Sequence, residues 1–170
     1  MLSKEELSEL LSTDVNSFNN EVKNVKGGAD LTEMDFSGIN VEGAEFFNAD
    51  LTSSTFSDST LTSVKFEGCD LTSVDFTRAN LIECSFNESV LNGTDFSYAK
   101  VDYCNFTDAD LAGAIVREAD LSNSEDYFIC ELDSTTLRMI DVSESIKNNN
   151  EKKAIAEGLI PITLTKELSE

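Results

Sequence analysis

The feature that most constrains this chain is an apolar residue at every fifth position over most of its length. The series is unbroken for nineteen positions. Its members are Leu31, Phe36, Val41, Phe46, Leu51, Phe56, Leu61, Phe66, Leu71, Phe76, Leu81, Phe86, Leu91, Phe96, Val101, Phe106, Leu111, Val116 and Leu121. An α-helix, with a period of 3.6, and a strand, with a period of 2, cannot place every fifth residue on one face. The pattern therefore indicates a coil in which each five-residue unit forms one side.

A longer period predicts how many units close the coil. Leucines recur twenty residues apart from Leu31 to Leu111, and two sets of phenylalanines recur at the same spacing. Four units then make one square coil, and like residues stack on like. A small residue (Ala, Ser or Cys) commonly stands two positions before each centre, so the first and third residues of a unit point inward. Stacked backbones would pair at about 4.8 Å and satisfy their hydrogen-bonding groups.

Units such as Ala-Asp-Leu-Thr-Ser at 49–53 and Ala-Asp-Leu-Ala-Gly at 109–113 resemble the pentapeptide-repeat family. The resemblance implies an all-β solenoid, namely a right-handed quadrilateral β-helix. The handedness is implied by the family alone, because the spacing of the residues does not determine it.

The sequence divides into three parts. We expect an N-terminal helical cap at 1–28, in which Ser3 and Glu6 have the spacing of a capping box and Thr13 or Asp14 begins a second helix. The solenoid is expected at 29–144, and a C-terminal helix and tail at 145–170. Such caps cover the apolar cross-sections that a solenoid exposes at its ends.

The repeat frame breaks at 124–129 and resumes one residue later at Leu132. We interpret the break as a one-residue bulge in a continuing solenoid; alternatively, the solenoid stops near Asn123 and the remainder forms a folded cap. The apolar segment 159–164 contains the single proline. It either packs on the last coil or pairs with a second copy, and the family resemblance implies that a homodimer through the C-terminal segment is one alternative.

Composition argues against catalysis. The chain has no histidine, which excludes Ser-His and Cys-His nucleophile pairs, an imidazole base and a Cys-His zinc site. Paired carboxylates need a concave site, which the flat sides of a solenoid do not provide. Cys84 and Cys104 lie twenty residues apart at inward positions, and we interpret them as buried thiols rather than a disulfide. We therefore expect no enzyme, no cofactor and no metal.

Charge is concentrated in the repeats. The net charge is −21, and residues 29–144 carry 24 acidic and five basic side chains. Direct binding to nucleic acid or to an anionic membrane is disfavoured, since both need basic side chains. The sequence has neither the apolar core of a signal peptide nor a membrane span, so we expect a cytoplasmic protein. A protein partner is the remaining expectation, although the sequence does not identify it.

Two interaction surfaces are candidates. The first consists of aspartates that precede the repeat centres, namely Asp30, Asp50, Asp70 and Asp110 on one side of the coil and Asp75 and Asp95 on the next. Over about 28 Å, duplex DNA carries roughly 16 charges, against 19 net here. The quinolone-resistance branch of the family implies a DNA mimic that binds a type II topoisomerase such as DNA gyrase.

The second candidate is an apolar contact at Tyr127, Phe128 and Ile129. Because the repeat itself favours Asp, the acidity is also explained without any partner.

Overall fold

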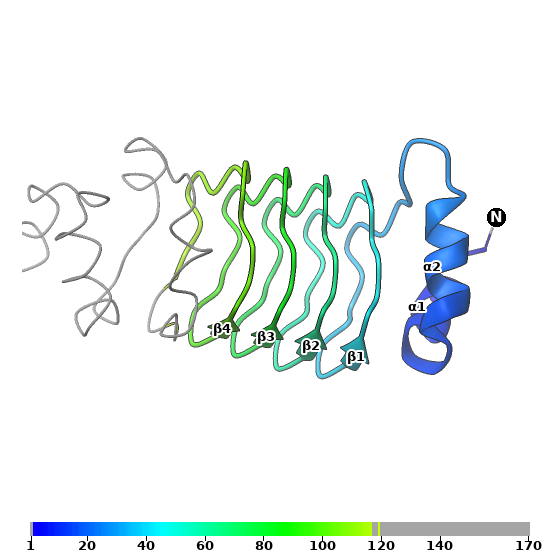
Figure 1. Ribbon diagram of the computed structural model, residues 1–170, viewed down its shortest axis with the longest axis horizontal. Coiled ribbons are helices and arrows are strands. Elements are labelled where there is room, and N and C mark those ends of the chain that lie inside the picture. The colour runs from blue at the N-terminus through cyan, green and yellow to red at the C-terminus, as the bar shows by residue number, and fades with distance from the viewer. Residues whose placement is uncertain (1, 117–118, 120–170) are drawn as a thin grey trace, which may run out of the picture.

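The computed structural model describes residues 2–116 and 119, in which two helices stand at one end of a solenoid (Figure 1). The helices are α1 (Lys4–Thr13) and α2 (Val15–Lys23). The strands are β1 (Asn40–Glu42), β2 (Thr60–Thr62), β3 (Asn80–Ile82) and β4 (Lys100–Asp102), and they form one parallel sheet in that order. No helix among these residues is both long enough and apolar enough to cross a membrane.

Each coil has four sides, which we name by their central residues. Side A contains Leu31 and its equivalents at twenty-residue intervals, side B contains Phe36 and its equivalents, side C contains Val41 and strands β1 to β4, and side D contains Phe46 and its equivalents. The strands pair in a register of twenty residues, with Val41 opposite Leu61. Isolated parallel bridges join the other sides in the same register. The predicted square coil of twenty residues is confirmed.

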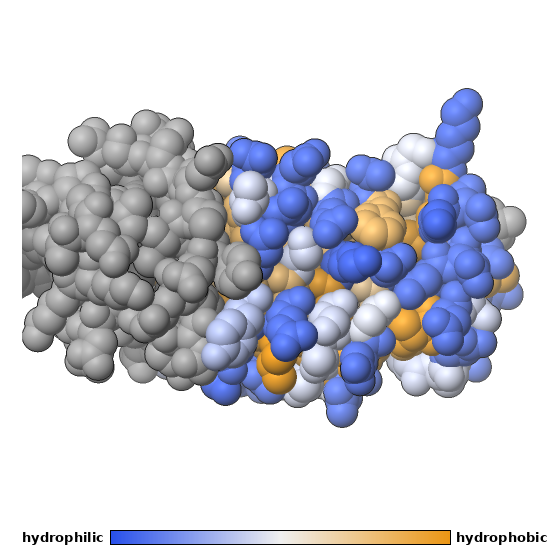
Figure 2. Space-filling view, in the orientation of Figure 1, coloured by the Kyte–Doolittle hydropathy of each residue, from blue (hydrophilic) through white to orange (hydrophobic). Residues whose placement is uncertain are grey.

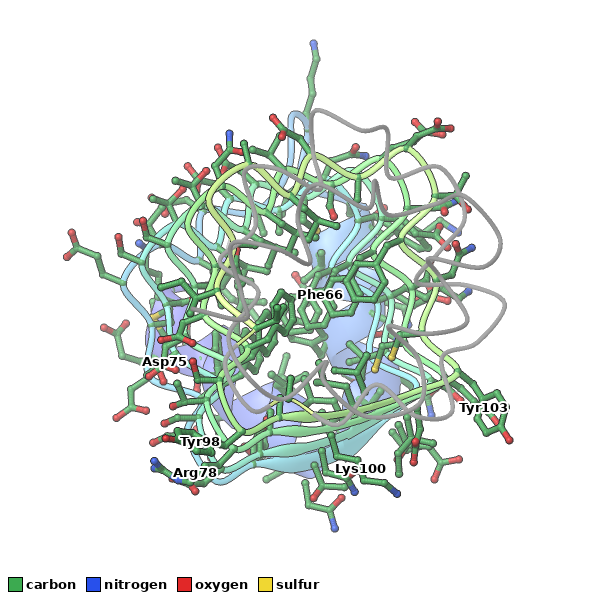
Figure 3. All side chains as sticks on the ribbon, turned by 90° about the vertical axis from the view of Figure 1, so that its left-hand side faces the viewer. Phe66, Asp75, Arg78, Tyr98, Lys100 and Tyr103 are labelled. Carbon is green, nitrogen blue, oxygen red and sulfur yellow. The ribbon has the colours of Figure 1, made fainter. Side chains whose placement is uncertain are left out.

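The solenoid is right-handed. Figure 3 views it from the C-terminal end, and the chain runs from the side of Asp75, past the corner at Arg78, to the side of Lys100 and the corner at Tyr103. This path is counter-clockwise and advances toward the viewer. The handedness that the family resemblance implied is therefore present in the structure.

The interior consists of stacked columns of identical or similar side chains. Phe66 lies at the centre of the cross-section (Figure 3), with ring centroids 5.0 Å from Phe46 and 5.1 Å from Phe86 on the same side. Across the coil it meets Phe56 and Phe76 edge to face, at 5.5 and 5.7 Å. Burying an aromatic side chain contributes about 2–3 kcal/mol. The repetition of one residue type at one place therefore stabilises the whole stack.

Each side ends at a corner where one residue has a positive φ. In all seventeen units centred on Leu31 to Leu111, this residue is the second after the centre. Five of these corners are glycine, and twelve are other residues. A non-glycine residue in this region is strained by about 1–3 kcal/mol. The chain thus accepts local strain at most corners in exchange for the stacked core.

The two helices cover the first coil. Ser3 and Glu6 form a capping box at the start of α1, and Asp14 caps α2 through the Ser17 N–H. Phe18 of α2 is buried, with its ring 5.1 Å from Phe46. At the exposed edge of the first coil, the Asn19 side chain donates to the Gly43 carbonyl (2.9 Å) and accepts from the Glu45 N–H (2.8 Å). These contacts satisfy backbone groups that would otherwise be open to another strand.

Candidate protein-interaction surface

The predicted aspartates form two columns on adjoining sides of the solenoid. On side A, Asp30, Asp50 and Asp70 bridge in sequence, and Val90 separates Asp70 from Asp110. On side B, Thr55 separates Asp35 from Asp75, and Asp75 bridges to Asp95. The side A aspartates are exposed, while Asp75 and Asp95 are half-buried. The structure therefore brings the six predicted aspartates, and Asp35 with them, onto two neighbouring faces.

Each of these carboxylates closes a local turn. The Oδ1 atom accepts a hydrogen bond from the backbone N–H two residues later. The N···O distances for Asp50, Asp70, Asp75, Asp95 and Asp110 are 3.0, 3.0, 2.7, 2.8 and 3.1 Å. This is the arrangement that makes Asp and Asn favourable in turns. The aspartates thus have a structural role in the repeat, whatever they bind.

One carboxylate oxygen remains open at four of these residues. Within the described part of the chain, Asp50, Asp70, Asp75 and Asp95 make hydrogen bonds through Oδ1 alone. None of the four forms an ion pair there, because the solenoid's described cations pair elsewhere. The pairs are Lys65 with Glu45 (2.8 Å), Arg78 with Asp58 (2.6 Å) and Lys100 with Asp102 (2.6 Å).

Asp30 differs from the other aspartates because the cap neutralises it. Lys4 Nζ lies 2.7 Å from Asp30 Oδ1 and also donates to the Thr32 carbonyl (2.9 Å) and to Thr32 Oγ1 (2.8 Å). The hydrogen bond from Lys4, with those from Thr32, lowers the pKa of Asp30 to about 2. Asp30 therefore joins the cap to the first coil and is the least available of the predicted interaction residues.

The charge density of the described solenoid is close to that of duplex DNA. Residues 29–116 carry 16 acidic and three basic side chains. These residues make roughly 4.4 coils, or about 21 Å at the usual strand spacing. The net charge is then one per about 1.6 Å, against one per about 1.7 Å for the duplex. The comparison concerns density alone, because the aspartates stand in columns rather than along two helical strands.

Exposed apolar side chains are few on this surface. Phe47, Ile82, Val90 and Ile115 occupy outward positions but are partly buried. Lys65 Nζ covers the ring of Phe47 at 5.6 Å from its centroid. The face in Figure 2 is predominantly hydrophilic, with small separate apolar patches. Tyr98 and Tyr103 are the exceptions, with 53% and 57% of their surfaces exposed.

Three cysteines of the described solenoid lie inside the coil. Cys69, Cys84 and Cys104 are buried, free thiols. Burial raises the pKa of Cys69 to about 12, and a hydrogen bond with Cys84, together with burial, raises the pKa of Cys104. Thiolates, which are the reactive form, are therefore scarce at Cys69 and Cys104 at neutral pH, whereas the hydrogen bond with Cys104 lowers the pKa of Cys84. Among the described residues, no group of His, Cys, Asp and Glu has an arrangement that would hold a metal ion.

Several predictions concern residues outside the described part of the chain. These are the candidate residues Tyr127, Phe128 and Ile129, the bulge at 124–129, the tail at 145–170 and the homodimer that it would form. They stay predictions. Two features are not predicted by the sequence. One is the contact of Lys4 with Asp30 and Thr32, and the other is the contact of the Asn19 side chain with the backbone of Gly43 and Glu45. Both join residues more than twenty positions apart, and no periodic signal marks them.

Several proteins of known structure are similar to parts of this chain. A pentapeptide repeat protein from the Arabidopsis thaliana thylakoid lumen is 26% identical, with 51% of this chain and 64% of that chain covered and a TM-score of 0.35. HetL from Nostoc sp. strain PCC 7120, involved in heterocyst differentiation regulation, is 21% identical (54% and 51% covered, TM-score 0.38). QnrB1, a plasmid-mediated fluoroquinolone resistance protein, is 21% identical (53% and 62% covered, TM-score 0.38). The chain thus spans less than two thirds of each, and no curated protein matches it in sequence.

Two family models match the repeats directly. One, described as a pentapeptide repeat region, matches residues 59–137, and another, described as pentapeptide repeats in eight copies, matches residues 27–62. The first match extends across the frame break at 124–129. Both agree with the twenty-residue register and the inward centres that the structure contains. The chain belongs to the pentapeptide-repeat family.

Proposed function

We propose that this protein is a non-enzymatic binding module that docks its acidic sides A and B on a positively charged surface of another protein. The observation that carries the proposal is the set of four aspartates, Asp50, Asp70, Asp75 and Asp95, that lie on adjoining faces of the stack and form no ion pair with any described residue. Complementary charge accelerates association and orients the partners. A flat, regular array of this kind offers many weak contacts rather than one pocket.

The test replaces these four aspartates with asparagine. Asn105 occupies the same position on side D, and its Oδ1 accepts from the Thr107 N–H at 3.0 Å, so asparagine keeps the turn while removing the charge. The wild type and the variant are immobilised, exposed to cell lysate and eluted with increasing salt. We expect proteins that the wild type retains at low salt to be absent from the variant.

A matched control removes four charges from other positions. Glu42→Gln, Glu67→Gln, Glu88→Gln and Asp108→Asn change sides C and D and the corners between sides D and A. This control should retain the same proteins as the wild type. Equal loss in both variants would mean that net charge, and not sides A and B, governs binding, and equal retention in all three proteins would contradict the proposal.

A more specific candidate is a DNA mimic that occupies the DNA-binding surface of a type II topoisomerase. The observation that favours it is the charge density of one per about 1.6 Å along the described solenoid, close to that of the duplex. A DNA gyrase supercoiling assay, titrated with the protein at two salt concentrations, tests it. We expect inhibition that weakens with salt, because exposed charges are screened, and that the four-asparagine variant lacks. Inhibition by both proteins, or by neither, would exclude this candidate and leave the more general proposal in place.

A further inference from the structure

Two exposed tyrosines bound one side of the solenoid. Tyr98 and Tyr103 occupy the corners before and after β4, with Lys100 between them (Figure 3). More than half of each side chain is exposed, at 53% and 57%. In the described part of the chain, neither phenol hydroxyl makes a hydrogen bond, so the rings gain little from the fold.

The backbone at both tyrosines is strained. Their φ angles are 61° and 54°, in the left-handed region. The other corners of the described solenoid hold Gly, Ser, Asn, Asp, Glu or Arg, and these are the two aromatic residues among them. A bulky residue in this region is an outlier. Every corner shares this conformation, so the turn geometry accounts for the strain but not for the choice of tyrosine, and an unburied ring at such a position points to a use outside the fold.

Charged residues of both signs flank the two rings, and Arg78 occupies the corner one coil before Tyr98. Tyr98 ends side B, which carries Asp75 and Asp95, and Figure 3 places Asp75 on the face that adjoins the Tyr98 corner. Tyr103 stands one coil after Glu83 at an equivalent corner. Arg78 and Lys100 are already in ion pairs, since Arg78 forms two bonds with Asp58 (both 2.6 Å) and Lys100 lies 2.6 Å from Asp102.

An exposed aromatic ring beside carboxylates is a recognition element for a cation. A cation that stacks on the ring is attracted by the ring's quadrupole, and the adjacent carboxylate adds a second attraction. Arginine suits such a position better than lysine, because its planar guanidinium stacks on an aromatic face and is more weakly hydrated. A nucleic acid would offer bases to the rings, but its phosphates would be repelled by the columns of aspartate.

We propose that Tyr98 and Tyr103 receive arginine side chains of a basic protein partner and so determine which partners the acidic sides accept. The inference rests on the function proposed above, since the partner is the protein that docks on sides A and B. It adds a stacking contact at Tyr98, on the edge of side B, and a second at Tyr103, at the far corner of side C, whereas the aspartates alone would bind any cationic surface.

The test replaces both tyrosines with asparagine, which tolerates the left-handed region better than tyrosine. Fluorescent octa-arginine and octa-lysine peptides are the probes, and binding is followed by anisotropy at low and physiological ionic strength. The wild type should bind octa-arginine more tightly than octa-lysine. The double variant should lose about tenfold for octa-arginine and little for octa-lysine. The salt dependence should stay unchanged, because no charge is removed.

Two controls separate recognition from folding. Tyr98→Phe with Tyr103→Phe keeps the rings and should bind as the wild type does. Ser53→Asn with Ser73→Asn changes two other corners without changing charge and should also have no effect. Thermal unfolding of the asparagine variant should occur at or above the wild-type temperature, since strain is relieved, whereas a structural role for the rings predicts a decrease.

The failures of the two proposals are distinguishable. If the double tyrosine variant binds octa-arginine as tightly as the wild type, while the four-asparagine variant binds it weakly, the inference is wrong and the acidic surface stands. If the four-asparagine variant binds as tightly as the wild type, the acidic surface itself is wrong, and so is the inference that depends on it.

Discussion

The residue before each repeat centre has one role on sides A and B and another on side C. On sides A and B, an aspartate before the centre accepts a hydrogen bond from the N–H just after it, as Asp50 does from Thr52. On side C, Asn40, Thr60 and Asn80 hold the position before the centre, and the residues after it lie inside β1, β2 and β3 and pair with the next coil. Sides A and B are joined by single bridges, whereas side C is a sheet.

The corners differ in the same way. After the centres of sides A and B, the turn is closed by a backbone hydrogen bond, such as Ser54 N–H to Leu51 O (3.0 Å) and Ala79 N–H to Phe76 O (3.0 Å). The corners that follow β1, β2 and β3 lack that bond. The same backbone bond closes the corners of side D, such as Ala49 N–H to Phe46 O (2.9 Å), so it does not require aspartate. Acidity on sides A and B is instead coupled to the additional side-chain hydrogen bond that each aspartate accepts in its turn. A surface that serves for binding is therefore also part of what holds the coil together.

The largest expected effect comes from breaking that coupling. Changing Asp50, Asp70, Asp75 and Asp95 to alanine removes four turn hydrogen bonds, whereas changing them to asparagine keeps the bonds. At about 0.5–1 kcal/mol per bond, the free energy of unfolding of the alanine variant should lie about 2–4 kcal/mol below that of the asparagine variant. Urea unfolding followed by circular dichroism measures the difference.

The two variants lose the same charge, so relief of repulsion between stacked carboxylates affects both equally. Their difference therefore isolates the turn. Equal stability of the alanine and asparagine variants would mean that the turn bonds contribute nothing. The aspartates would then be retained for their charge alone.

The interior was predictable from sequence because every unit meets the same environment. Phe66 sees another phenylalanine above, below and across the coil, so its identity follows from its place in the period of twenty. The same logic predicted that aspartates would stack, since position in the unit determines the side. The ion pair of Lys4 with Asp30 was not predictable, because it depends on how the non-repetitive helix α1 packs on the first coil.

The strain at Tyr98 and Tyr103 illustrates another limit. A sequence indicates that these residues point outward, but the period of five does not say which outward position takes the left-handed conformation. That conformation follows from the turn geometry, which puts it at the second residue after every centre. Once this is known, any tyrosine at that position in the repeat can be recognised as strained.

A smaller effect is expected where the column of side A is interrupted. Val90→Asp allows a new turn bond in which the carboxylate accepts from the Asn92 N–H. It also places a charge about 4.8 Å from Asp70 and from Asp110. The repulsion costs about 1 kcal/mol for each neighbour in a water-like dielectric. The variant should be less stable than the wild type at low salt by about 1 kcal/mol. In roughly 1 M salt, where the Debye length is about 3 Å, it should equal or exceed the wild type.

Asn40→Asp is the matched control for this change. It adds one charge at the same position of a unit on side C, where Asn40 is exposed and begins β1. Its column neighbour is Thr60 rather than aspartate. Its stability should therefore change little with salt. The comparison between the sides would be wrong if Val90→Asp and Asn40→Asp responded to salt alike.

The smallest expected effect separates Asp30 from the rest of its column. Because the pKa of Asp30 is lowered to about 2 in the folded protein from 3.8, its ionised form adds stability above about pH 4, and this stability is lost as the pH falls through 2. Lys4→Gln should reduce the free energy of unfolding at neutral pH by less than about 1 kcal/mol, since the pair is exposed. The difference between wild type and variant should shrink between about pH 4 and pH 2. A difference that stays constant over this range would mean that Lys4 acts through Thr32 and not through Asp30. The cap would then be joined to side A by hydrogen bonds to Thr32, and Asp30 would be as free to bind a partner as Asp50.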